Sequence, residues 1–427
     1  MKPWMRVALA MFVVGWGANQ FSPLLLVYRR GGAVSESAVT MAFGAYALGL
    51  IPALLLAVPI ARRCGQVRTM RAVLALSAVA SLILVVGGER MWALVLGRLL
   101  AGVASGAAFA PGTAWVKELS DGDSPGAGAR RAAMALSVGF GGGPLVAGAL
   151  AQWLSAPEVV PYLVHIGLTA CVAPLVWNAP TGVTSATGHD EAGLRGLGAI
   201  FGHSGFRFQV APTAPLVFGT ATTSLAVLPA LVPPHGLSVA ASGGLAGLTL
   251  ASGAAAQPLA RRMSKRSHHA IRHWGLAAGT AGFLLGAVTI RLHDPVVLIP
   301  AAITLGACYG MLMVAGLSRV EALAAPHELA GAAAVFYCLS YLGFAAPYLV
   351  TAVGHWVPPA VLLICAACVV AALIPATALV RAPDSGSGPS AGRGRSVRRG
   401  TEGPAGTPTV RRESHQDPAW ERKTSCA

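Results

Sequence analysis

The sequence predicts an all-helical polytopic membrane protein with twelve transmembrane helices in two pseudo-symmetric six-helix bundles. Composition gives the first indication, because 55% of the 427 residues are hydrophobic and only 11% are charged, whereas soluble globular proteins carry about 25% charged residues. The second is a series of apolar runs of helix length that continues to about residue 380. The third is an internal repeat that relates the two halves of the chain.

Each apolar run is long enough to cross a membrane, since a hydrocarbon core about 30 Å thick takes roughly 20 helical residues. The predicted spans cover residues 7–28, 38–60, 72–88, 91–115, 132–153, 159–178, 210–232, 238–259, 273–290, 295–316, 331–354 and 358–380. The first run follows Lys2 and Arg6, as the apolar part of a signal peptide would. It continues without a small-residue cleavage site, so we expect it to be retained as the first span.

The repeat divides the chain into domains. We expect a first bundle over 1–180, a cytoplasmic linker over 181–208, a second bundle over 209–381 and a disordered basic cytoplasmic tail over 382–427, where Gly, Ser, Pro and Arg dominate. The pairs that align between the halves are Pro59 with Pro258, Arg62 with Arg261, Arg63 with Arg262, Gly102 with Gly306, Gly106 with Gly310, Ser137 with Ser340, and Pro144 with Pro347. Two repeated six-span halves are typical of secondary transporters.

The formal net charge of +15 is unevenly distributed along the chain. Without the tail, seventeen Lys and Arg residues lie at the N-terminus and after spans 2, 4, 6, 8 and 10, against four in the opposite loops. By the positive-inside rule, this asymmetry predicts that both termini are cytoplasmic. The same asymmetry explains the basic net charge by the orientation of the chain in a lipid bilayer, so no nucleic-acid partner is predicted.

The fifth span contains the stretch SVGFGGGPLVAGAL, residues 137–150. Glycine and proline destabilise a helix in water, but in lipid the internal hydrogen bonds persist because no water competes for them. Glycines spaced by four form a groove in which another helix packs closely. Pro144 removes one backbone hydrogen bond and is expected to bend the span. We expect the fifth span to be a bendable helix without large side chains at the interface between the bundles. The alternative is that its glycines serve tight helix packing alone.

Three motifs identify a family resemblance. The segment Gly139–Gly148, with Gly143 and Pro144 inside it, resembles the GxxxGPxxGG signature of the drug:proton antiporter branch of the major facilitator superfamily. The stretch RLLAGVASG, which begins at Arg98, resembles the fourth-helix motif of that branch. PIARRCGQVRTMR resembles the loop motif GxLADRxGRR, but Arg62 replaces the aspartate of the family.

The resemblance implies a bacterial plasma-membrane transporter that exports a small amphipathic compound in exchange for protons by alternating access. It also implies a cavity lined by spans 1, 4, 7 and 10. The candidate cavity residues are Asn19, Gln20, Arg98, Thr220, Thr223, Ser224, Tyr309, Tyr337 and Tyr341. Asn19 and Gln20 are mid-span amides, which are costly without partners, and Arg98 is an intramembrane charge. Each has an alternative role. The amides could form hydrogen bonds between helices, Arg98 could be a structural clamp bound to a backbone carbonyl, and the tyrosines could serve packing alone.

All sixteen acidic residues fall outside the predicted spans, so a buried carboxylate for proton exchange is not evident. His165 in span 6 titrates in a suitable range, although a buried, hydrogen-bonded histidine explains it equally well. Glu118 and Glu321 follow spans 4 and 10 in equivalent positions. We expect them to form a cytoplasmic gate with the arginine pairs that follow spans 2 and 8: Arg62, Arg63, Arg261 and Arg262.

Two other functions remain as alternatives. The missing buried acids and Arg98 favour uptake or uniport of a neutral or anionic solute. A membrane-embedded sensor or enzyme would need a reactive motif, and no HExxH or P-loop sequence occurs. We therefore predict no enzymatic activity and no cofactor. No metal site is expected either, since a solvated loop explains His268, His269 and His273 better than metal ligation.

Overall fold

The computed structural model describes residues 1–32, 34–88, 90–123, 127–180, 198–232, 238–264, 268–325 and 328–379. They belong to one compact unit, Met1–Ala382. Every regular element within these ranges is helical. Twelve helical segments in them are long and apolar enough to cross a membrane, which confirms the predicted fold class.

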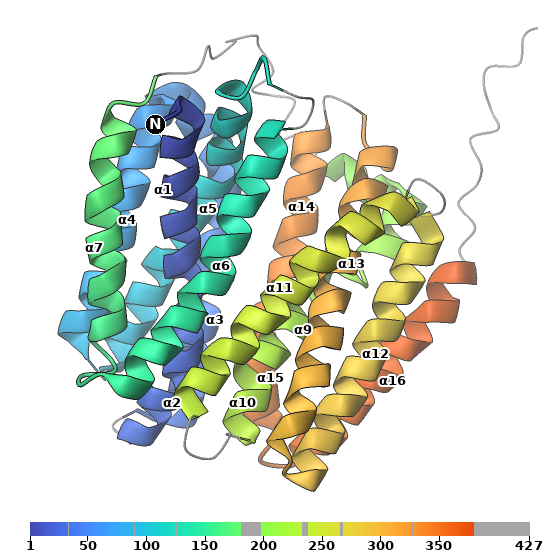
Figure 1. The fold of residues 1–427 in the computed structure, drawn as a ribbon. Helices are drawn as coiled ribbons and strands as arrows, with labels where there is room; N and C mark the ends of the chain where they lie inside the picture. The colour runs from blue at the N-terminus through green and yellow to red at the C-terminus, as the bar shows by residue number, and fades with distance from the viewer. Residues whose placement is uncertain are drawn as a thin grey trace, which may run out of the picture. The chain divides into compact units, whose positions relative to one another are not determined.

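The first half of the chain forms six of these segments (Figure 1). Its first span is divided into α1 (Pro3–Asn19) and α2 (Phe21–Gly31), and the others are α3 (Glu36–Cys64), α4 (Gln66–Gly87), α5 (Met91–Glu118), α6 (Ala127–Trp153) and α7 (Val160–Trp177). Several boundaries differ from the prediction. The first span begins at Pro3, the third at Gln66 and the fifth at Ala127, because helices continue past the apolar run into the polar ends.

The second half forms the other six segments, several of them irregular. Span 7 consists of η2 (Phe206–Val210), α9 (Ala214–Thr222), η3 (Thr223–Val227) and α10 (Leu228–Leu231), preceded by the short turn η1 (Ile200–Gly202). The remaining elements are α11 (Ser238–Ser264), α12 (His268–Leu292), η4 (Pro295–Val297) with α13 (Leu298–Leu323), α14 (Leu329–Tyr341) with η5 (Leu342–Ala345) and α15 (Ala346–Val353), and α16 (Pro359–Leu379).

We name the two ends of the helix array by their connections. The basic end carries the N-terminus and the connections α3–α4, α5–α6, α11–α12 and α13–α14, and the opposite end carries the connections α2–α3, α6–α7 and α10–α11. The positive-inside prediction assigns the basic end to the cytoplasm, and this orientation remains a prediction.

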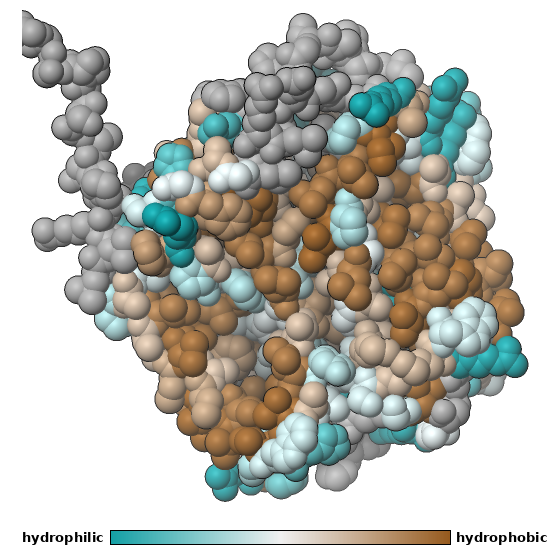
Figure 2. Space-filling model, turned by 180° about the vertical axis from the view of Figure 1, so that it is seen from behind, coloured by the Kyte–Doolittle hydropathy of each residue, from teal (hydrophilic) through white to brown (hydrophobic). Residues whose placement is uncertain are grey.

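The outer surface of the helices is apolar. Figure 2 shows hydrophobic side chains across the middle of one face and hydrophilic ones toward its edges. Large apolar side chains such as Leu48 and Val86 are 69% and 72% exposed. Exposed apolar area on this scale is typical of a surface that faces lipid.

Glycines make equivalent contacts in the two halves. A Cβ at Gly106 of α5 would lie 2.5 Å from the carbonyl oxygen of Leu50 on α3. A Cβ at the aligned residue Gly310 of α13 would overlap the carbonyl oxygen of Gly253 on α11 in the same way. Both helix pairs therefore touch backbone to backbone, as small residues permit in membranes. The predicted domain boundaries remain predictions, since residues 181–197 and those after 379 lie outside the described ranges.

Candidate functional site

A cavity of about 770 Å³ lies between residues of the first half and residues of the second half. Its first-half lining comes from the end of α1 and from α3, α5 and α6, and its second-half lining from α9, η3, α11, α13, α14 and η5. The polar lining residues are Asn19, Tyr46, Thr113, Lys117, Ser137, Thr222, Gln257, Arg261, Tyr309, Ser318, Glu321, Tyr337 and Tyr341. A volume of this size accommodates a small organic molecule.

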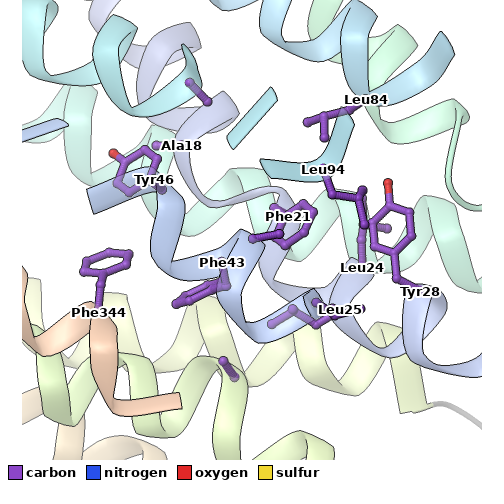
Figure 3. Close-up of a cluster of buried hydrophobic side chains, with 14 of the residues drawn as sticks. Ala18, Phe21, Leu24, Leu25, Tyr28, Phe43, Tyr46, Leu84, Leu94 and Phe344 are labelled. Atoms are coloured by element: carbon purple, nitrogen blue, oxygen red, sulfur yellow. The ribbon is translucent and has the colours of Figure 1, made fainter. Parts of the chain in front are cut away.

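Aromatic rings close the inner end of the cavity. Phe218 of α9 stacks on Tyr341 of α14 with ring centroids 4.4 Å apart, and Phe344 of η5 packs against both rings. From α3, Tyr46 lies 5.5 Å from Phe344 between ring centroids. Figure 3 shows Tyr46 and Phe43 approaching Phe344 from the neighbouring helix. We call Tyr46, Phe218, Tyr341 and Phe344 the aromatic floor.

Charged residues lie at the other end of the cavity. Lys117 of α5, Arg261 of α11 and Glu321 of α13 line it near the basic-end termini of their helices, and all three are exposed. The cavity therefore reaches the surface at the basic end. Among the lining residues that the structure describes, Glu321 is the single carboxylate.

The two halves meet at the opposite end. The Gln152 side chain of α6 accepts hydrogen bonds from the backbone N–H groups of Val239 and Ala240, in the first turn of α11, at 3.1 and 3.4 Å. Arg30 of α2 donates to the Ser238 hydroxyl. Val239 belongs to the same buried apolar cluster as Phe21 of α2. These contacts separate the cavity from the opposite end.

Helix α6 uses its small residues on two faces. A Cβ at Gly143 would lie 2.5 Å from the carbonyl oxygen of Trp16, so one face packs on the backbone of α1. A Cβ at Gly148 would lie 3.0 Å from the Cα of Gly243, so the other face packs on α11, which runs beside α6 (Figure 1). The predicted motif thus forms one close contact within the first half and one between the halves, with Gly139 also on the α1 side.

The first span is interrupted beside the cavity. Helix α1 ends at Asn19 and α2 begins at Phe21, with Gln20 between them. Pro23 explains the interruption, because it has no N–H to donate to the carbonyl of Asn19 four residues earlier. Asn19 lines the cavity. Gln20 is 1% exposed and is directed into the first bundle, where its Nε2 donates to Ser81.

Arg98 of α5 is enclosed rather than open to the cavity. It is 1% exposed, and its Nη1 donates to the carbonyl oxygen of Ala18 at 2.9 Å. Its guanidinium lies 4.9 Å from the ring centroid of Phe21 and 4.5 Å from that of Tyr46. The aromatic faces and the carbonyl compensate the buried positive charge. The residue contacts α1, α2 and α3 at the interruption of the first span, which matches the carbonyl-bound clamp of the sequence alternatives.

Of the predicted cavity residues, the structure brings together Asn19, Tyr309, Tyr337 and Tyr341. Thr220, Thr223 and Ser224 do not line it: the two threonine hydroxyls donate to backbone carbonyls one turn earlier, and Ser224 pairs with Thr249. Thr222 lines the cavity in their place. The lining residues of this span, Phe218, Ala221, Thr222 and Leu225, recur at helical spacing and therefore share one face of the helix. The spacing alone does not indicate which face of the helix is turned toward the cavity.

The predicted gate residues are apart in this conformation. Glu118 accepts a hydrogen bond from Gln66 Nε2 at 3.0 Å, and Arg261 donates to Gln257. Glu321 lines the cavity mouth. Arg63 and Arg262 are exposed, and the side chain of Arg62 lies outside the described part. The gate therefore remains a prediction about another conformation.

A second buried arginine, Arg272, is not among the predicted site residues. The predicted solvated loop is wrong for His268, His269 and His273, which lie in α12 together with Arg272. Arg272 is 5% exposed and donates to Gln209 and Thr377. It lies one turn after two histidines and a serine, at the edge of the apolar run. In the sequence this position does not distinguish it from the other basic residues of the polar connection. Within the described ranges, no group of three His, Cys, Asp or Glu residues is arranged to hold a metal.

A repeated helical membrane protein with a cavity between its halves, accessible from one end, defines the class of secondary transporters that work by alternating access. The family model of the Major Facilitator Superfamily matches residues 7–346. The chain belongs to this superfamily of transporters. This membership confirms the predicted fold and the expectation of a transport protein rather than an enzyme.

Solved structures show the same fold. A mutant of the nucleoside transporter NupG is 13% identical with a TM-score of 0.70, and the match covers 88% of this chain and 99% of that one. A second NupG structure is 12% identical with a TM-score of 0.68, covering 89% and 100%. No curated protein matches the sequence. The predicted antiporter branch is not tested by these matches, and identities this low show the fold alone.

Proposed function

We propose that the protein exports a small amphipathic compound with a flat apolar part, in exchange for protons, across the bacterial plasma membrane. The observation that carries the proposal is the cavity between the halves, with an aromatic floor and a rim of hydroxyl and amide groups. Aromatic faces favour flat apolar groups by offset stacking. The amide of Asn19 and the tyrosine hydroxyls supply directional hydrogen bonds to the polar part.

Alternating access requires the two halves to separate at one end while they close at the other. The contacts of Gln152 and Arg30 at the opposite end then break, and the basic end closes. In the closed basic end, we expect Glu118 and Glu321 to meet the arginines in the last turns of α3 and α11. With both termini in the cytoplasm, the present conformation is the one that loads substrate from the cytoplasm.

Glu321 is our candidate for proton exchange. It is the carboxylate among the described lining residues, and it lies in the last turn of α13, between the cavity and the surface. In the proposed exchange, this carboxylate carries the proton. Glu321 is also one of the two carboxylates of the predicted cytoplasmic gate. Its protonation would therefore weaken its pairing with the gate arginines and so couple to closure of the basic end.

A second candidate function is uptake or uniport of an uncharged solute such as a nucleoside. The lining of the inner cavity favours it, because among the described lining residues the charged ones lie at the mouth and those around the aromatic floor are uncharged. The solved structures with this fold are described as nucleoside transporters, which makes uridine a natural probe.

The experiment is flux into and out of proteoliposomes that contain the purified full chain. Ethidium and uridine serve as probes, each with and without an imposed pH gradient, and empty vesicles provide the blank. Ethidium movement driven by the gradient supports proton-coupled export. Uridine flux that ignores the gradient supports the second candidate, and no protein-dependent flux of either probe contradicts both.

A further inference from the structure

A chain of hydrogen bonds crosses the core of the first bundle. Gln20 Nε2 donates to the Ser81 hydroxyl of α4 at 3.3 Å, and this hydroxyl lies 2.8 Å from His165 Nδ1 of α7. His165 Nε2 lies 3.2 Å from the carbonyl oxygen of Val13 on α1. The three side chains of Gln20, Ser81 and His165 are 1%, 3% and 0% exposed. The cavity lining does not include Ser81 or His165.

The direction of the chain follows from its two ends. The Val13 carbonyl can only accept, so Nε2 of neutral His165 carries the proton and Nδ1 accepts from the Ser81 hydroxyl. The Ser81 oxygen is then free to accept from the Gln20 amide. Each donor in the chain has one acceptor. Loss of the Ser81 hydroxyl would leave the buried Gln20 amide without the acceptor shown here.

This chain ends at the interruption of the first span. Gln20 is the single residue between α1 and α2, and its neighbour Asn19 lines the cavity. The imidazole also lies against the backbone of α1, because a Cβ at Gly17 would be 2.6 Å from His165 Nε2. The side chains of residues 19 and 20 therefore point to different surroundings, one into the cavity and one into the bundle.

Other titratable groups in the core of the first bundle lie on neighbouring helices. Tyr28 of α2 donates to the Tyr162 hydroxyl one turn before His165 on α7, and Arg98 of α5 binds Ala18. Arg98 thus holds the residue before Asn19, while Ser81 holds the residue after it. The interruption is fixed from both sides.

We propose that Ser81 and His165 are positioning residues that hold Gln20 in the bundle and thereby direct Asn19 into the substrate cavity. The proposal rests on the proposed function only in treating Asn19 as a substrate contact. The two residues act through Gln20 and touch no substrate. Their effect is a change in the orientation of residue 19, which can be measured without a substrate.

The test uses Asn19→Cys as a reporter in the full chain, with Cys64, Cys171, Cys338, Cys365, Cys368 and Cys426 replaced by serine, so that the buried Cys308 is the one native cysteine left. Its rate of modification by a methanethiosulfonate reagent measures access to residue 19. Ser81→Ala is expected to change this rate at least fivefold. Ser77→Ala, at another buried serine of α4 (4% exposed), is the matched control and should leave the rate unchanged, as should Ser81→Thr, which keeps the hydroxyl.

Two substitutions of the histidine separate its contacts. His165→Asn can keep an acceptor toward Ser81, whereas His165→Gln can keep a donor toward Val13 but not that acceptor. The proposal predicts that His165→Asn retains more of the original rate than His165→Gln. Equal rates for Ser81→Ala, Ser81→Thr and Ser77→Ala would overturn it. If the rates differ while neither ethidium nor uridine is transported, the positioning role stands and the proposed function fails.

Discussion

Gly148 of α6 and Gly243 of α11 meet at the opposite end of the molecule, so closely that a Cβ on Gly148 would lie 3.0 Å from the Cα of Gly243. The contact joins the two halves without side chains. Backbone-to-backbone contacts of this kind pack well in a membrane, where lipid gives no hydrophobic drive for helix association. Because no side chains interlock there, the contact can also separate without repacking. Together with the hydrogen bonds of Gln152 and Arg30, it holds the halves together at the opposite end.

Substitution at this contact should open the opposite end. A Cβ at Gly243 would overlap the carbonyl oxygen of Pro144, so Gly243→Val forces α6 and α11 apart. Overpacking costs roughly 1–3 kcal/mol, which shifts a two-state equilibrium by about 5- to 150-fold. A Val239→Cys reporter, 4% exposed here, should be labelled faster by the same factor.

Gly244→Val is the matched control, because no atom lies within 4 Å of a Cβ at that position. Equal labelling of the reporter in the two valine variants would show that the glycine contact does not hold the halves together.

The aromatic floor should contribute to substrate affinity. Phe218→Leu removes the ring that stacks on Tyr341 at 4.4 Å. Aromatic pairs contribute about 0.5–1.5 kcal/mol beyond the area they bury, so the KM of the transported probe should rise about 2- to 13-fold with little change in kcat. Phe201→Leu, an exposed ring outside the cavity lining, should leave the KM unchanged. A fall in kcat with an unaltered KM would be inconsistent with a binding role.

Proton coupling should depend on Glu321. Glu321→Gln keeps the size and hydrogen-bonding capacity of the side chain but cannot exchange a proton. Ethidium exchange at equal pH should continue, whereas accumulation driven by a pH gradient should be lost. Glu158→Gln, a carboxylate in the α6–α7 connection and outside the cavity lining, is the control. Gradient-driven accumulation that survives in Glu321→Gln would remove this residue from the coupling mechanism.

Arg98 should stabilise the folded first bundle. Arg98→Lys removes the planar group that lies over Phe21 and Tyr46, and a compact ammonium does not stack in this way. We expect a loss of about 1–2 kcal/mol, measured as a lower midpoint of thermal unfolding in detergent. Arg90→Lys, exposed at the start of α5, should keep the midpoint. Identical midpoints for the two variants would argue against the clamp.

The fold was predictable from the sequence because transmembrane helices depend on one property, apolar length. All twelve predicted runs correspond to helical spans, and the glycines aligned by the repeat, such as Gly106 and Gly310, make equivalent contacts. Glycine at these positions predicts close helix packing, since two helix backbones can touch only where no side chain separates them.

The cavity was only partly predictable, because its residues depend on which face each helix turns inward. Asn19 and Gln20 are adjacent amides with similar chemistry, yet the interruption beside Pro23 sends one into the cavity and the other into the bundle. In span 7, Thr222 lines the cavity instead of Thr223, because the face that carries Phe218, Ala221 and Leu225 is turned inward. The sequence does not indicate which face of a helix is turned inward.

Transport by alternating access requires the two halves to close at one end while they open at the other. A pair of distance distributions between spin labels in lipid nanodiscs measures this movement at both ends. Labels at Leu154 and Trp356, both exposed beside opposite-end connections of the two halves, report one end, and labels at Lys117 and Arg261 report the other. We expect two populations whose distances change in opposite directions at the two ends when ethidium or pH is varied. A single distribution at each end under all conditions, or distances that lengthen together at both ends, would contradict it.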